Sequence, residues 1–338
     1  MKKLLLASTA LVMTAGVAAA EVALSGNARM GFIYDGNDVQ LTSRARVTFT
    51  LSGETDGGLA FGARFDADDA DTAAGEERMT DGTVFISGEF GTLTFGDTSS
   101  AARAATGDLY GVGLTGLDDQ NEMNYLDRVM FTDEIGGLTN GGLDVSAATF
   151  SGSVVSEQNY DTSALYAYTI DGFSGFIGLS QNNQSGADSQ IMVSLGGAYT
   201  WEGLTAALGA ELVRTEVGAL SFDSNHVTAS LEYEMDMFSA KAFVGRVGGD
   251  LGTLLDANPD YSKTHGGVSV QGSFDATTVT AFVRRDVFGN TDAGLGMGYD
   301  LGGGATFRAG IVRDETYNTA TSLYQRETIA DLGLAFTF

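Results

Sequence analysis

Residues 41–51 read Leu41-Thr-Ser-Arg-Ala-Arg-Val-Thr-Phe-Thr-Leu51, and their side chains alternate in polarity. The odd positions carry small or apolar side chains, whereas the even positions carry only threonine and arginine. Successive side chains of a β-strand point to opposite faces, whereas helical spacing would scatter these residues around a cylinder. The stretch therefore predicts a strand with one apolar and one polar face.

The same alternation recurs along the chain and predicts an all-β protein. A soluble β-sandwich needs only about seven to nine strands. About twice as many alternating strands indicate an antiparallel transmembrane β-barrel with a wet interior and a lipid-facing exterior. We expect 18 strands, near residues 22–34, 39–53, 58–68, 81–88, 91–97, 125–133, 143–151, 162–170, 174–182, 190–201, 203–215, 225–235, 239–247, 263–274, 277–287, 292–301, 304–313 and 327–338.

The connections between the strands support a barrel. Tight turns such as Asp171-Gly172 alternate roughly with longer loops at 69–80, 98–124, 216–224, 248–262 and 314–326, an asymmetry typical of transmembrane barrels. No change in composition marks a second domain, so residues 21–338 are expected to form one barrel domain. The last strand should pair with the first and remove the sheet edges, with Leu332, Leu334, Phe336 and Phe338 facing lipid.

Composition excludes several classes of protein. The chain has 338 residues and a formal net charge of −26, which disfavours a nucleic-acid partner because phosphate is bound by Lys and Arg. It has no cysteine, and its only two histidines, His226 and His265, argue against a multi-histidine metal site. Residues 1–20 combine Lys2 and Lys3, an apolar stretch and three alanines, which is the pattern of a cleaved signal peptide. We therefore expect an exported protein without a cofactor.

The polar faces of the first three strands carry a cluster of arginines. Strict alternation places Arg29, Arg44, Arg46 and Arg64 on the lumen side of neighbouring strands. Charged rings at a constriction select solutes in pores, so these guanidiniums are candidates for one basic wall. The alternative is that each arginine merely pairs with a nearby aspartate of the barrel wall.

The longest loop, about residues 97–124, carries the opposite charge. A loop of this length is usually functional. Its apolar residues Leu109, Tyr110, Val112, Leu114 and Leu117 favour a loop that folds inward against the barrel wall. The alternative is a surface loop whose acids bind divalent cations near lipopolysaccharide. The acidic candidates are Asp97, Asp108, Asp118, Asp119 and Glu122.

Several segments resemble general diffusion porins, in particular those of alphaproteobacteria. Ser87–Asp97, read as SGEFGTLTFGD, is similar to the strand, turn and strand before the porin constriction loop. Gly107-Asp-Leu-Tyr110, Leu117-Asp-Asp119, the start EVALSGNARMGFIYDG and the terminal Phe338 are also similar to that branch. The resemblance covers residues 21–338.

The resemblance implies a homotrimer of 16-stranded barrels in the cell outer membrane. Each barrel would conduct small hydrophilic solutes and ions past an arginine cluster that faces acids of the loop. Asp97 fits this role less well because it lies at a strand end, and Arg103 within the loop would weaken the field. The family count of 16 implies a miscounted hairpin, expected near 203–247, or a wider barrel. The resemblance also implies that the strand ending at Phe338 is read by the barrel-insertion machinery.

Other assignments stay open from the sequence. Asp66, Asp68, Asp69 and Asp71 have the oxygen density that a divalent cation such as Ca²⁺ prefers, although a solvated acidic loop tip explains them better. The faces of Arg246, Arg284 and Arg308 are ambiguous. An outer-membrane hydrolase would need a nucleophile beside His226 or His265, in an arrangement that the sequence does not display. A surface adhesin would need one much longer external loop. Outer-membrane lipid and lipopolysaccharide are the expected surroundings.

Overall fold

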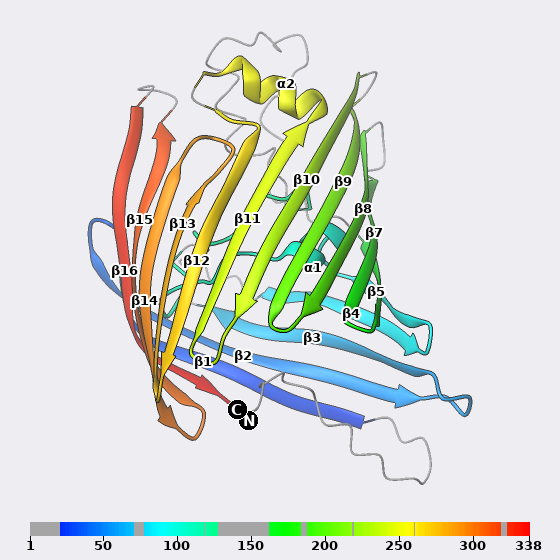
Figure 1. Cartoon of the computed structure of the whole chain (residues 1–338). Coiled ribbons are helices and arrows are strands. Elements are labelled where there is room, and N and C mark those ends of the chain that lie inside the picture. The colour runs from blue at the N-terminus through cyan, green and yellow to red at the C-terminus, as the bar shows by residue number, and fades with distance from the viewer. Residues whose placement is uncertain are drawn as a thin grey trace.

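A computed structural model of the chain describes residues 21–70, 78–117, 119–127, 162–183, 188–217, 220–259, 261–318 and 323–338. In this part of the chain, sixteen strands form one closed antiparallel barrel, and two short helices lie in the loops between strands (Figure 1). The elements are β1 (Glu21–Tyr34), β2 (Val39–Glu54), β3 (Ala60–Ala70), β4 (Arg78–Gly88), β5 (Gly91–Gly96), α1 (Ala101–Thr106), β6 (Thr162–Ile170), β7 (Phe173–Asn183), β8 (Asp188–Trp201), β9 (Leu204–Val217), β10 (Leu220–Glu234), β11 (Phe238–Gly248), α2 (Gly249–Ala257), β12 (Thr264–Phe274), β13 (Thr277–Arg285), β14 (Thr291–Gly302), β15 (Ala305–Asn318) and β16 (Leu323–Thr337).

The last strand closes the barrel against the first, as the sequence predicts. β1 pairs with β2 on one side and with β16 on the other, in a register that places Met30 opposite Leu334. At the end of this seam, the N–H of Phe338 donates to the carbonyl of Gly26 at 2.9 Å. Every strand of the described barrel therefore has two neighbours, and no sheet edge is left to lipid.

The strand count of 18 from the alternation is wrong, and the count of 16 is confirmed. β5 pairs directly with β6, with Thr92 opposite Ala167, so the sheet is complete without the strands expected near 125–133 and 143–151. Residues 125–127 are not part of a strand, and 128–161 lie outside the described residues. The expected error near 203–247 is also wrong, because β9, β10 and β11 occupy that stretch.

The outer wall of the barrel is apolar. Leu41 is 74% exposed, and Leu24 and Leu208 are each 65% exposed. Water-soluble proteins rarely expose apolar patches of such extent, whereas a lipid-facing barrel requires them. Aromatic side chains near the tight turns, including Tyr199 and Trp201, also point outward, where an interfacial girdle is expected.

The alternation does not predict either helix. α1 lies inside the long loop and α2 replaces part of the loop expected at 248–262. α2 sits at the end of the barrel opposite the C-terminus (Figure 1) and buries Leu251 and Leu255 against a cluster that includes Tyr261 and Phe288. Neither helix reaches the length or the apolar character that crossing a membrane as a helix demands, among the residues described.

The long loop folds into the barrel, as its apolar residues predict. We call residues 97–127, with 118 outside the described residues, the inward loop. Its Leu109, Val112, Leu114 and Leu117 are buried. The loop packs closely against the wall because several wall residues that face it are glycines, which have no side chain. A Cβ on Gly196 of β8 would lie 2.0 Å from the carbonyl oxygen of Ala101 in α1.

Glycines on other strands make room for the loop in the same way. A Cβ on Gly209 of β9 would meet Ala102 at 2.6 Å, and one on Gly310 of β15 would meet Gly113 at 2.5 Å. At the seam, Gly333 of β16 leaves room for Leu114. Larger residues at these positions would push the inward loop toward the middle of the lumen.

Gly196→Ala should lift α1 from the wall and destabilise the folded barrel by about 1–3 kcal/mol, the usual cost of overpacking. Gly298→Ala in β14 is the matched control, because the nearest atom to its added Cβ is 3.8 Å away. The temperature at which the heat-modifiable folded band disappears on gels measures the effect. Equal midpoints for the two variants would show that the close packing at Gly196 is not needed.

Candidate functional site

The inward loop begins with a capped helix turn. The side-chain oxygen of Ser100 accepts from the N–H of Arg103 at 3.1 Å, and this bond caps α1. α1 ends at Gly107, whose φ of 59° is unfavourable for residues with a side chain. The N–H of Ala101 donates to Oγ of Ser194 in β8 at 2.9 Å. These contacts fix the start of the loop on the β8 wall.

Arg103 organises the interior of the inward loop. Its Nη2 lies 2.6 Å from Oδ2 of Asp108 and 3.1 Å from Oε1 of Glu122. The other oxygen of Asp108 accepts from the N–H of Met123 at 2.8 Å, which ties the two limbs of the loop together. Although burial opposes its charge, the carboxylates of Asp108, Asp127 and Glu122 raise the pKa of Arg103. Two of the predicted acids therefore hold the loop in shape.

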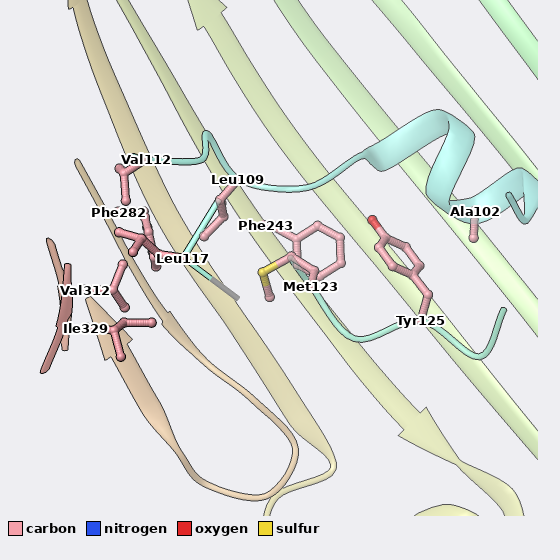
Figure 2. Close-up of a cluster of buried hydrophobic side chains, with 10 residues drawn as sticks. All are labelled: Ala102, Leu109, Val112, Leu117, Met123, Tyr125, Phe243, Phe282, Val312 and Ile329. Carbon is pink, nitrogen blue, oxygen red and sulfur yellow. The ribbon is translucent and has the colours of Figure 1, made fainter. Parts of the chain in front are cut away.

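A buried apolar cluster joins the inward loop to the wall (Figure 2). Figure 2 shows the loop residues facing side chains that come from β11, β13, β15 and β16. Tyr125 packs edge-on against Phe243, with ring centroids 5.7 Å apart, and burial raises the pKa of its hydroxyl. The members of the cluster are Ala102, Leu109, Val112, Leu117, Met123, Tyr125, Phe243, Phe282, Val312 and Ile329.

Two charged wall residues anchor the loop at its far side. Oδ2 of Asp331 accepts from the N–H groups of Leu114 at 2.9 Å and Thr115 at 2.6 Å. Arg284 donates to the side chain of Gln120 at 2.7 Å and to the carbonyl of Glu122, while Asp292 holds it at 2.8 Å. The sequence pattern predicts neither anchor. Alternation did place Asp331 on the lumen face, but no local pattern shows which loop atoms it binds.

All four predicted wall arginines lie on the lumen face of β1, β2 and β3, on the same side as Thr48 and away from the exposed Leu41 and Phe61. Arg29 and Arg44 are direct cross-strand partners. Arg44 and Arg46 share Asp68, at 2.9 Å from Nε in each case, so pairing with wall aspartates does occur. A register shift between Arg64 and Asp66 interrupts the pairing of β3 with β4 there. Such irregularities re-aim side chains.

Arg29 and Arg64 differ from this pair. The Nη1 of Arg29 donates to the carbonyl of Thr115 at 3.5 Å. Its guanidinium also interacts electrostatically with charged neighbours, namely Arg44, Asp331, Asp68 and Asp119. Arg64 is the most open of the four arginines, with 62% of its side chain exposed and Asp66 3.9 Å away.

The predicted acids occupy different places. Asp119 is exposed and has a φ of 53°. Asp97 lies just beyond β5, with an exposed side chain, and its N–H donates to the carbonyl of Gly82 at 3.2 Å. Asp118 lies outside the described residues. Among the arginines of ambiguous face, alternation with exposed neighbours places Arg246 outside the barrel and Arg284 and Arg308 inside.

The predicted cation cluster does not form one unit in the described residues. Asp66 and Asp68 lie in β3, not in a loop tip, and bind Arg46. Asp71 lies outside the described residues. Nowhere in the described ranges do three His, Asp or Glu side chains form a group that could hold a metal ion.

Comparisons with known proteins match this architecture. The Gram-negative porin family matches residues 7–319. A porin of Rhodobacter capsulatus is 34% identical over 333 residues, which cover 94% of this chain and all of that protein. A porin of Fuscovulum blasticum is 27% identical over 328 residues, with the same coverage.

Solved structures agree with these relatives. A porin structure refined at 1.8 Å resolution is 32% identical, has a TM-score of 0.70, and is covered completely by 94% of this chain. A variant of Rh. blastica porin, 20% identical with a TM-score of 0.59 and the same coverage, supports the fold alone. The closed 16-stranded barrel, its inward loop and these relatives lead to one conclusion: the chain belongs to the Gram-negative porin family.

Proposed function

We propose that a charge separation across the lumen sets which solutes pass through this outer-membrane porin. Family membership implies a channel for passive diffusion rather than an enzyme. The observation that carries the proposal is the inward loop, which lies inside the barrel and packs its segments around Asp108 and Glu122 on β12 and β13, whereas Arg44 and Arg46 lie on β2. Solutes would pass through the space between them.

The two sides have opposite charge. On the wall, four arginines and two carboxylates, Asp66 and Asp68, leave a formal excess of two positive charges. On the inward loop, Arg103 is outnumbered by Asp108 and Glu122, and Asp119 is exposed beyond them. A transverse field between such sides orients polar solutes and disfavours large apolar ones. The exposed guanidinium of Arg64 would contribute most directly.

Replacing both Arg44 and Arg46 by alanine should shift ion selectivity toward cations, because Asp68 and Asp66 lose their counter-ions. A unit charge about 10 Å away in water changes the energy of an ion by about 0.4 kcal/mol. Two charges therefore change the permeability of cations and of anions about fourfold each, in opposite directions, and the permeability ratio about sixteenfold. The reversal potential of a planar bilayer under a salt gradient measures the shift. Arg246→Ala, which removes one arginine charge from the outer wall, is the control. Unchanged selectivity in the double variant would remove this pair from the constriction.

We also propose that three barrels assemble into a trimer with separate pores. The broad apolar outer wall can serve both lipid contacts and contacts between barrels. Purified protein added to a planar bilayer should insert in events of three equal conductance steps. Consistent insertion in single steps by correctly folded protein would contradict the trimer.

The remaining proposals concern export and surroundings. Residues 1–20 would act as a cleaved signal peptide, and the β16 strand ending at Phe338 would be read by the barrel-insertion machinery. The longer loops would lie outside the cell, among lipopolysaccharide, where their acids could bind Ca²⁺. The tight turns and Phe338 would lie on the periplasmic side, as in barrels of this architecture. No cofactor is required for passive diffusion.

A further inference from the structure

Three polar side chains from the lumen face of the wall meet beneath the inward loop. They are Glu211 of β9, His226 of β10 and His265 of β12, and their exposed fractions are 0%, 0% and 2%. β11 separates the two histidines, and its Gly245 lets them meet. A Cβ on Gly245 would lie 2.2 Å from Nε2 of His265 and 2.6 Å from Nε2 of His226. We call these three residues the buried relay.

Hydrogen bonds connect the buried relay in one line. Oε2 of Glu211 lies 2.8 Å from Nδ1 of His226, and the Nε2 atoms of the two histidines lie 2.8 Å apart. The imidazole rings stack with centroids 5.0 Å apart. An ionised carboxylate only accepts, so Nδ1 of His226 donates to it, and a single hydrogen then lies between the two Nε2 atoms. Among the described residues, Nδ1 of His265 and Oε1 of Glu211 have no hydrogen-bond partner.

The buried relay holds the inward loop directly. Oε2 of Glu211 also accepts from the N–H of Leu126 at 2.9 Å. Tyr125 packs edge-on against His226, with ring centroids 5.9 Å apart. The hydroxyl of Tyr125 donates to the carbonyl of Gly107 at 2.8 Å and lies 2.9 Å from Oγ1 of Thr106. The two limbs of the loop therefore join at Tyr125, immediately above the histidine pair.

The charges around the relay limit how many protons it can hold. Arg284 of β13 interacts electrostatically with His265. Tyr125 interacts electrostatically with Arg103 and Asp108 of the loop and with Glu211 of β9. One imidazolium balances the charge of Glu211 and keeps both hydrogen bonds. A second imidazolium would place two N–H groups face to face across 2.8 Å and put two like charges near Arg284. The bond between the rings cannot survive this.

We propose that Glu211, His226 and His265 are positioning residues for the inward loop, and that double protonation of the histidine pair releases the loop and reduces conduction in acid. The inference rests on the proposed function, because it assumes that the loop borders the conducting path. Once the rings separate, Tyr125 loses the surface on which it packs. Residues 125–127 can then leave the wall and enter the lumen.

Single-channel recording between about pH 7 and about pH 3 tests this. The second protonation puts two buried like charges near Arg284 and therefore needs more acid than an ordinary histidine, which titrates near 6.5. The unmodified protein should lose at least about half of its open-channel conductance in one step on acidification. His265→Gln, which keeps a hydrogen-bonding side chain but cannot become charged, should conduct normally near pH 7 and lack the step. Identical pH profiles for both proteins would overturn the proposal.

Ser194→Ala provides the matched control for a merely structural effect. It removes the bond from Ala101 to the wall but no titratable group, so it should change conductance near pH 7 and retain the acid step. An acid step that disappears in this variant as well would also count against the relay. Glu211→Gln should move the step to lower pH, because an imidazolium without the carboxylate charge is harder to form.

Nitrogen NMR of the unmodified protein in micelles tests the relay without any conduction. The chain has only two histidines, so every imidazole signal belongs to the pair. Coupled groups should titrate in joint steps and not as two separate residues. Two independent titrations near the ordinary histidine pKa of about 6.5 would overturn the proposal. Absence of any conductance near pH 7 would instead reject the proposed function and leave this measurement intact.

Discussion

The backbone pairing of β1 with β16 is the interaction on which the rest of the structure depends. In lipid, an unpaired backbone N–H or C=O has no water to bind, so a sheet can cross the membrane only when it closes. Closure joins residues from the two ends of the described chain, such as Met30 and Leu334. It also creates an interior that is shielded from lipid, and the wall arginines and the inward loop lie there.

The interior is divided by the inward loop, which is held by the wall in two ways. Small residues and glycines let α1 and the segment near Gly113 lie close to the strands. Buried polar groups, above all Asp331, Arg284 and Glu211, satisfy backbone groups of the loop that would otherwise be costly to bury. Arg29 of the wall contacts the loop at Thr115, whereas Arg44 and Arg46 bind Asp68 of the wall. Shape and charge of the channel thus follow from one packing arrangement.

Paired charges in this lumen serve two purposes. Asp108 and Glu122 bind Arg103 and thereby stabilise the loop, although their positions suggest a role toward solutes. Asp68 similarly keeps two neighbouring guanidiniums together, which would otherwise repel each other. A change at one of these residues is therefore expected to affect both the loop and the field in the lumen.

The sequence by itself determined the strands, their faces and the closing role of residues 332–338, because alternation is a local property of each strand. It also located the inward loop from its apolar residues, and the lumen face of Arg29, Arg44, Arg46 and Arg64. The alternation pattern predicts more strands than the sixteen of the barrel and predicts neither α1 nor α2, because short segments carry a weak periodic signal. Only the tertiary structure decided which groups meet. Leu126 and Glu211 are 85 residues apart, and Leu114 and Asp331 are 217 apart, so no local pattern could reveal these bonds. The histidine pair likewise exists only because β11 pairs with both β10 and β12 and aligns them around Gly245.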